Sequence, residues 1–239
     1  MFPIGDDNSQ RKLTPWVNYL LIALNIFVFF YFQSIGTNDF FTLSFSTVPA
    51  EILSGSDIVN ETLQPTPIPV YGTIITAMFM HGSVTHLLGN MLYLWIFGDN
   101  LENVMGHARY LIFYILCGII ATFCHVYSAE ILNNGLLIPS LGASGAISGV
   151  LGGYLLLFPR NLVRVFALAF VIRIPAFITL GLWIAMQIVE SIGIINSGYE
   201  GGGVAYAAHI GGFIAGLILV KFFVKKQTVI DYRNQHFVR

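Results

Sequence analysis

Long apolar runs alternate with short polar segments along almost the whole chain. The runs expected to cross a membrane are residues 16 to 33, 74 to 98, 109 to 128, 143 to 158, 174 to 193 and 204 to 224. A helix that crosses a bilayer needs about 20 residues, so these lengths predict an all-α, polytopic bundle of six transmembrane helices. Residues 161 to 173 are also apolar, but arginines and a proline interrupt this stretch. It is therefore interpreted as a juxtamembrane connection.

Composition supports this class of protein. Of the 239 residues, 56% are hydrophobic and only 10% are charged, and the mean hydropathy is +0.75. Soluble proteins are about one quarter charged. We expect a short cytoplasmic N-terminus over residues 1 to 15, a six-span domain over 16 to 224 and a cytoplasmic tail over 225 to 239. The start has no basic segment followed by an apolar core and cleavage site, so no removable signal peptide is expected.

The charged residues sort by side of the membrane. With six spans, every basic residue falls on the side that holds both termini: Arg11, Lys12, Arg109, Arg160, Arg164, Arg173, Lys221, Lys225, Lys226, Arg233 and Arg239. The opposite loops carry only acids: Asp39, Glu51, Asp57, Glu61, Glu130, Glu190 and Glu200. Lys and Arg are enriched in cytoplasmic loops, so both termini are predicted to be cytoplasmic. A seventh span would break this sorting.

The longest loop, residues 34 to 73, lies on the predicted outer side. It mixes phenylalanines with acids and ends in a proline-rich stretch at residues 65 to 69. Such a segment suits an amphipathic element at the membrane interface. A disordered loop with a proline-rich spacer is the alternative.

Polar side chains inside the apolar runs are the informative residues, because they are costly there and usually face the interior of a bundle. His86 and Asn90 are four residues apart, so they share one helix face and can present two donors to one point. His81 lies off that face and is expected to support the start of the helix. Ser144 and His209 lie in the fourth and sixth runs. Each of these residues alone could simply be a hydrogen-bonding contact between helices.

Small residues give a reason for Ser144 and His209 to meet. Two stripes with a spacing of four residues border them: Gly145, Gly149 and Gly153 in the fourth run, and Ala208, Gly212 and Gly216 in the sixth. Such stripes allow the backbones of two helices to approach closely. Packing of the fourth helix on the sixth would then bring the hydroxyl and the imidazole within hydrogen-bonding reach. The glycines could also serve packing alone.

A serine hydroxyl needs a base to remove its proton as it attacks. His209 could be that base, and neither run contains a carboxylate to orient it, so the pair would be a dyad. The oxyanion that forms needs hydrogen-bond donors. His86, Asn90 and the backbone N–H of Ser144 are the candidates.

These residues occur in segments that together resemble the rhomboid family of intramembrane serine proteases. The segments are Gly142-Ala-Ser144-Gly145, Ala208-His209-Ile-Gly-Gly-Phe-Ile-Ala-Gly216, His81-Gly-Ser-Val-Thr-His86-Leu-Leu-Gly-Asn90 and Phe97-Gly-Asp-Asn-Leu-Glu102. The resemblance covers nearly the whole chain and implies that Ser144 is the nucleophile, His209 the general base, and His86 and Asn90 oxyanion donors. It implies no metal, cofactor or nucleic-acid partner. The implied partners are the lipid bilayer and membrane-protein substrates, which are cleaved in or near their transmembrane segments. Glu102 would be structural.

Two positions depart from the family pattern. The long first loop lacks the Trp-Arg pair of some members. The residue four after the nucleophile is Ser148, where some members have an aromatic residue that packs on the catalytic histidine. We expect that Tyr206 or Ser148 holds His209 instead.

A peptide bond within a helix must unwind before attack, so we expect substrates with Gly, Ala, Ser or Pro near the scissile bond. Two segments are candidate gates that admit substrate from the lipid: residues 34 to 73 and residues 190 to 203. The second contains glycines that would allow such movement, Gly198, Gly201, Gly202 and Gly203. A flexible loop without a gating role is the alternative there.

Two other classes of function remain. A transporter could use intramembrane His and Asn, but no inverted repeat or buried mid-span acid is present. An inactive relative that binds membrane clients would usually lack the nucleophile or the base, and this chain has both. No Arg-rich and Ser-rich transit peptide is present, so the predicted location is the plasma (inner) membrane of a prokaryote.

Overall fold

The computed structural model describes residues 2–167, 170–197 and 206–224. The long helices are α1 (Trp16–Phe27), α5 (Val84–Met105), α6 (His107–Leu132), α7 (Ser144–Leu157), α8 (Ala176–Ser197) and α9 (Tyr206–Phe223). A π-helical turn, Val28–Phe32, extends α1. The candidate gate glycines 198 and 201 to 203 and the predicted tail from residue 225 lie outside the described residues.

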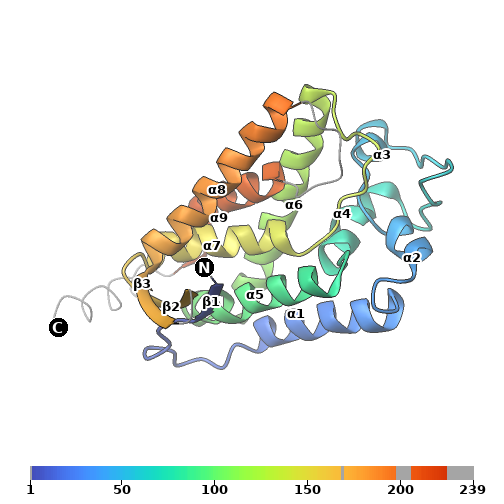
Figure 1. The fold of residues 1–239 in the computed structure, drawn as a ribbon. Helices are drawn as coiled ribbons and strands as arrows, with labels where there is room; N and C mark the ends of the chain where they lie inside the picture. Colours follow the sequence, from blue (N-terminus) through green and yellow to red (C-terminus); the bar gives the residue numbers. More distant parts are fainter. Residues whose placement is uncertain (1, 168–169, 198–205, 225–239) are drawn as a thin grey trace.

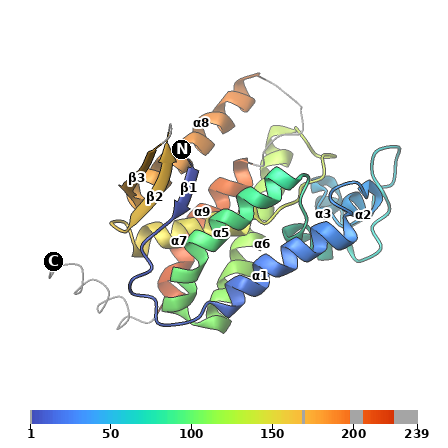
Figure 2. The same ribbon diagram turned by 60° about the horizontal axis from the view of Figure 1, so that its bottom comes forward.

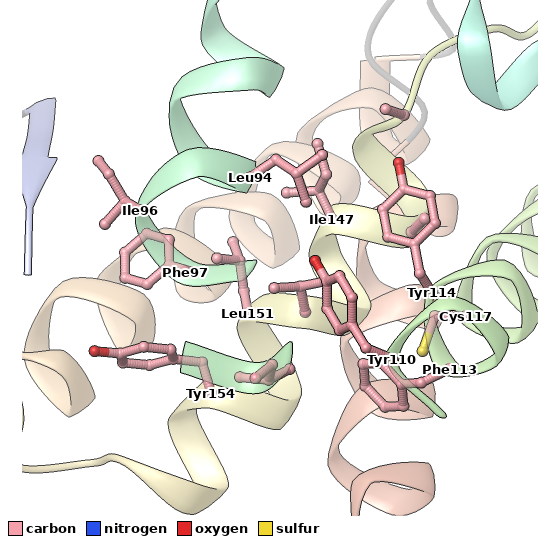
Figure 3. Packing of buried hydrophobic residues seen from close by; sticks show 14 of the residues in the cluster. Leu94, Ile96, Phe97, Tyr110, Phe113, Tyr114, Cys117, Ile147, Leu151 and Tyr154 are labelled. Atoms are coloured by element: carbon pink, nitrogen blue, oxygen red, sulfur yellow. The ribbon is translucent and has the colours of Figure 1, made fainter. Parts of the chain in front are cut away.

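Helix α7 lies in the middle of the bundle, with α5, α6 and α9 around it (Figures 1 and 2). Its buried side chains join the main hydrophobic core. Figure 3 shows part of this core, which includes Leu94 and Phe97 of α5, Tyr110 and Phe113 of α6, and Leu151 and Tyr154 of α7. Because three helices cover α7, a residue at its start is held by a rigid framework.

Three of the described helices are long and apolar enough to cross a membrane. They are α6, the first 18 residues of α8 (Ala176–Gly193), and α9. The apolar segments Trp16–Phe32, Val70–Phe79 and Ser144–Leu157 are shorter. Membrane crossing by α6, α8 and α9 therefore has support from length and composition, and the count of six remains a prediction.

The predicted second span, 74 to 98, is not one continuous helix. Its beginning forms the short helix α4 (Thr73–Thr76) and a 3-10 turn, η3 (Ala77–Phe79), which follows a first 3-10 turn, η2 (Val70–Gly72). The chain is extended at Ser83, whose side chain accepts a hydrogen bond from the backbone N–H of His86 and caps α5. Helix α5 then continues to Met105, where Gly106, with φ +80°, ends it. The prediction was wrong here because hydropathy does not register an N-cap.

The chain is mostly helical, but the expectation of an all-α fold misses a sheet. Strands β1 (Phe2–Gly5), β2 (Leu162–Ala167) and β3 (Phe170–Pro175) form an antiparallel sheet in the order β1-β2-β3. Val163 and Val165 are buried on one face, while the residues between and beside them are exposed. This alternation is that of a half-buried strand. The predicted juxtamembrane connection is therefore a hairpin that pairs with the N-terminus.

The long loop of residues 34 to 73 lies at the opposite end of the bundle from the sheet (Figures 1 and 2). It contains two short helices, α2 (Asp39–Ser44) and α3 (Pro49–Ser54). Thr47 and Ser140 exchange backbone hydrogen bonds, at 3.0 and 2.7 Å. This contact joins the loop to the segment that precedes Ser144, so the loop is part of the packed structure and the disordered alternative does not hold.

The N-terminal segment packs into the sheet end of the bundle through buried polar contacts. Tyr154 donates a hydrogen bond to Asp6 Oδ2 at 2.6 Å, and Asn100 Nδ2 donates to the same oxygen at 2.8 Å. Arg11 forms an ion pair with Asp99 at 2.7 Å. The carboxylate of Glu102 is buried and accepts hydrogen bonds from the backbone N–H groups of Val17 and Asn18 at the start of α1. Such groups have no partner within the helix, so Glu102 has a structural position.

Asp6 should make the stability of the protein depend on pH. Burial raises the pKa of Asp6 to about 7 from 3.8, and the Tyr154 hydroxyl offsets only part of this effect. Between those values the folded state holds a proton that the unfolded state lacks, so stability falls as pH rises from about 4 to 7. We expect the thermal unfolding midpoint to decrease over that range, through a loss of at most a few kcal/mol.

Asp6→Asn removes the titrating group at nearly unchanged shape, so it should flatten this part of the profile. Asp39→Asn, at an exposed acid of α2, is the matched control and should keep the wild-type slope. An Asp6→Asn profile as steep as that of the wild type would rule out Asp6 as the cause.

Candidate functional site

Ser144 and His209 lie within hydrogen-bonding distance of each other. Ser144 is the first residue of α7, and His209 is in the first turn of α9. The Ser144 hydroxyl lies 2.8 Å from His209 Nε2. His209 is 8% exposed and Ser144 is half-buried, so the pair is shielded by protein on one side and accessible on the other.

The close approach of α7 and α9 depends on their glycines. A Cβ added at Gly212 would lie 2.2 Å from the carbonyl oxygen of Gly145, and one at Gly216 would lie 1.9 Å from that of Gly149. No side chain fits at such distances, so the two backbones are in direct contact. Gly153 is different, because it faces side chains of α5, α6 and α9, the nearest being Leu101. The contact of Gly212 with Gly145 is one turn from His209 and brings its imidazole to Ser144.

His209 is held by α8. Its Nδ1 donates a hydrogen bond to Gln187 Oε1 at 2.6 Å, which leaves Nε2 to accept from the Ser144 hydroxyl. The ring of Trp183 lies over the imidazole, with centroids 5.9 Å apart and planes tilted by 37°. Gln187 and Trp183 are one helical turn apart and therefore lie on one face of α8.

Ser148 and Tyr206, which were expected to hold His209, form hydrogen bonds with other residues. The Ser148 hydroxyl donates to the backbone carbonyl of Ser144 at 2.6 Å, and the Tyr206 hydroxyl donates to Glu190 at 2.5 Å. The expectation for both residues was therefore wrong. Gln187 was missed, although it is an amide within the apolar run Leu182-Trp-Ile-Ala-Met-Gln-Ile-Val189. The rule that singled out Asn90, a polar residue among apolar ones, would have found it.

Removal of the Gln187 amide should slow the reaction at this site without abolishing it. Gln187→Leu leaves the Nδ1–H of His209 without an acceptor, so the ring can rotate or adopt the other tautomer. A hydrogen bond of this kind contributes about 1 kcal/mol, so we expect roughly a fivefold lower kcat with little change in KM. Gln187→Glu keeps an acceptor at the same position and should recover part of the rate. Equal rates for the wild type and Gln187→Leu would show that Gln187 does not position His209.

His86 and Asn90 face the loop just before Ser144. A Cβ at Gly142 would lie 2.9 Å from His86 Nε2 and 3.7 Å from Asn90 Nδ2, so both nitrogens lie beside this glycine. Gly142 has φ +125°, a conformation that other residues rarely adopt. The backbone N–H of Gly82 donates to His86 Nδ1 at 3.4 Å, which makes Nε2 the nitrogen that carries a proton.

A short chain of hydrogen bonds fixes Asn90. Its Nδ2 donates to His81 Nε2 at 2.9 Å, and His81 is fully buried. Gln33, which directly follows the π-helical turn after α1, exchanges two hydrogen bonds of 3.0 Å with the backbone of His81. His81 thus supports the start of α5, while Ser83 caps it. The Asn90 amide keeps a second N–H, which is free to donate on the side of Gly142.

Two cavities meet at Ser144 and His209. The larger, about 810 Å³, is lined by α5, α6, α7 and the loop before α7, and includes His86, Asn90, Thr122 and His125. The smaller, about 270 Å³, lies between α5 and α8 and includes Tyr93 and Trp183. A hydroxyl within hydrogen-bonding distance of an imidazole, nearby N–H groups and an adjoining cavity are the parts that acyl transfer needs.

Several known proteins are similar to this chain over much of its length. The chain is 32% identical over 154 residues to Rhomboid protein 1, mitochondrial, of Saccharomyces cerevisiae, which covers 64% of this chain and 42% of the yeast protein. It is 30% identical over 207 residues to Rhomboid protease GluP of Bacillus subtilis, over 84% of this chain and 34% of GluP. It is 26% identical over 231 residues to the human presenilin-associated rhomboid-like protein, mitochondrial, over 92% of this chain and 54% of the human one.

The chain thus spans between a third and about half of the length of these relatives. Two of them are named as mitochondrial, so the comparisons do not support the predicted plasma membrane. The sequence model of the Rhomboid domain family matches residues 70–226 of this chain. These residues run from η2 through α9 and include both Ser144 and His209. The match covers well over half of the sequence and confirms the resemblance drawn from the motifs. The chain is a membrane-integral protein and belongs to the rhomboid family.

Proposed function

We propose that this protein is an intramembrane serine endopeptidase that cleaves transmembrane segments of other membrane proteins. The observation that carries the proposal is the 2.8 Å contact between the Ser144 hydroxyl and His209 Nε2, with Gln187 on the other ring nitrogen. This arrangement leaves Nε2 unprotonated and directed at the hydroxyl. A histidine so oriented is a base, whereas one that donates from both nitrogens is not.

In the first half of the reaction, Ser144 Oγ attacks the carbonyl carbon of the scissile bond and its proton moves to His209 Nε2. The carbonyl electrons move to the oxygen, which becomes an oxyanion. The backbone N–H of Ser144 has no acceptor within α7 because it belongs to the first turn, so it can donate to this oxygen. His86 Nε2–H and the second N–H of Asn90 complete the set.

The intermediate then collapses. The oxyanion reforms a carbonyl, the C–N bond breaks, and the proton on His209 Nε2 passes to the departing amine. The remaining product is an ester between Ser144 Oγ and the N-terminal fragment of the substrate, joined through the carbonyl of the cleaved bond. A water molecule from the larger cavity attacks this acyl-enzyme and gives a proton to His209, which returns it to Ser144 Oγ. Serine and histidine are regenerated, and no metal or cofactor takes part.

The substrate enters as a strand rather than as a helix. A carbonyl inside a transmembrane helix is hydrogen-bonded to its own backbone, so Gly, Ala, Ser or Pro near the scissile bond favours cleavage by weakening the helix. The smaller cavity lies between α5 and α8, and α8 is poorly covered by the rest of the chain, so this side suits lateral entry from the lipid. We propose with this that the chain has six spans and cytoplasmic termini, which puts Ser144 nearer the outer face.

The test uses the purified full chain in proteoliposomes with a single-span substrate that carries a Gly-Ala or Ala-Ser pair in its helix. The wild type should cut the substrate near that pair, and a fluorophosphonate probe should add its mass to Ser144 alone. A matched substrate with a poly-Leu span is the control and should be cut far more slowly. Absence of both cleavage and labelling would support the inactive client-binding relative instead.

A further inference from the structure

The face of the three-stranded sheet that points away from the core carries a pair of arginines. Arg164 of β2 lies directly opposite Arg173 of β3, and both side chains are exposed. Gly5 of β1 is the next residue across the sheet, and a Cβ there would lie 2.3 Å from Arg164 Nη2. The guanidinium of Arg164 therefore lies over β1 at Gly5. A residue with a side chain at this position would collide with the guanidinium.

This pair lacks an anion within the described protein. Neither arginine forms an ion pair with a carboxylate of residues 2–167, 170–197 or 206–224. Like charges directly opposite each other destabilise a sheet. A phosphate placed between the two guanidinium groups would remove that repulsion and could accept hydrogen bonds from both.

Apolar side chains lie on the same hairpin, nearer its tip. Phe166 and Val171 form the next pair on the outer face and are 50% and 55% exposed. They are two residues from the arginine pair, which is about 7 Å along a strand. Apolar groups of interfacial segments reach about 5 to 10 Å below the headgroups. At one depth of the hairpin, the arginines can therefore contact headgroups while the apolar side chains contact acyl chains.

The hairpin also lies at the boundary of the membrane. Strand β3 ends at Pro175, and the membrane-spanning part of α8 begins at the next residue, Ala176. Figures 1 and 2 show the sheet at the foot of α8, at the end of the bundle that holds the N-terminus. Basic residues mark this end as the predicted cytoplasmic side, where the leaflet contains anionic lipids.

We propose that the outer face of the β2–β3 hairpin is a lipid-binding site, in which Arg164 and Arg173 hold the phosphate of an anionic phospholipid and Phe166 and Val171 contact its acyl chains. The tail of the chain is not a suitable occupant, because residues 225 to 239 carry Lys225, Lys226, Arg233 and Arg239 against a single acid, Asp231. The site is separate from Ser144 and does not depend on the proposed proteolysis.

The test measures lipid binding to the delipidated full chain in neutral detergent by native mass spectrometry. Phosphatidylglycerol is titrated against the wild type, Arg164→Gln/Arg173→Gln, and Arg109→Gln as the control with a basic residue removed elsewhere on the same side. Phosphatidylcholine, which has the same phosphate but no net charge, is titrated in parallel. The thermal unfolding midpoint of each variant shows that it is folded.

We expect the double variant to bind the first phosphatidylglycerol at least roughly tenfold more weakly, because each charge near an anionic surface contributes appreciably. Arg109→Gln should bind as the wild type does, and phosphatidylcholine should bind weakly to all three. Equal losses in the double variant and Arg109→Gln would overturn the proposal in favour of diffuse attraction. So would an unchanged affinity in the double variant.

Discussion

Cleavage of a single-span substrate should fall at least about a thousandfold in Ser144→Ala, because this variant lacks the proposed nucleophile. His209→Ala should cause a loss of similar size, since the hydroxyl then has no base 2.8 Å away. Residues that act as one unit are not additive, so the double variant should be no slower than either single one. The measurement is the single-turnover rate in proteoliposomes, at substrate concentrations above KM.

Two controls lie beside these residues. Ser148→Ala removes the next hydroxyl of α7, which donates to a backbone carbonyl, and His125→Ala removes another imidazole from the wall of the same cavity. Both variants should stay within a fewfold of the wild-type rate. Undiminished cleavage by Ser144→Ala would remove the nucleophile from the proposal, whereas an inactive wild type would remove the activity itself.

The approach of Ser144 to His209 could be expected from the sequence because its cause is local and periodic. Glycines four residues apart define a helix face, and Gly212 and Gly216 do lie against the backbone of α7. The same holds for Asn90, whose distance of four residues from His86 places both on one side of α5. Where chemistry depends on residues of one helix face, a single sequence contains the needed information.

The position of His209 could not be predicted in the same way. Gln187 reaches it from α8, and the tilt of that helix depends on packing that no spacing rule gives. From the resemblance to some family members, an aromatic contact to His209 would be expected from position 148 of α7, whereas the ring of Trp183, which lies over His209, comes from α8. A single amide within an apolar run is therefore best interpreted as a hydrogen-bonding partner for a polar residue of a neighbouring helix.

The sheet could not be predicted because its partners are far apart in the sequence. Residues 162 to 167 alternate in burial, yet β2 pairs with β1 some 160 residues earlier, and a four-residue strand has almost no pattern of its own. Hydropathy registers the hairpin only as an apolar stretch with arginines. Long-range strand pairing, like the contact of Asp6 with Tyr154, depends on the fold as a whole.

Removal of one oxyanion donor should have the next largest effect. Asn90→Ala and His86→Ala each take away a side-chain N–H beside Gly142, where the carbonyl oxygen of the substrate would lie, and such losses cost about two to three orders of magnitude in kcat. KM should change little, because the donors act mainly on the charge that develops in the transition state. Thr122→Val is the control, since this hydroxyl lines the same cavity but donates to its own helix at Gly118. His81→Phe removes the hydrogen bond that supports Asn90 but no donor to the substrate. Its kcat should therefore lie between that of Thr122→Val and that of Asn90→Ala. If kcat is unchanged in both Asn90→Ala and His86→Ala, the backbone N–H groups at the start of α7 must stabilise the oxyanion alone.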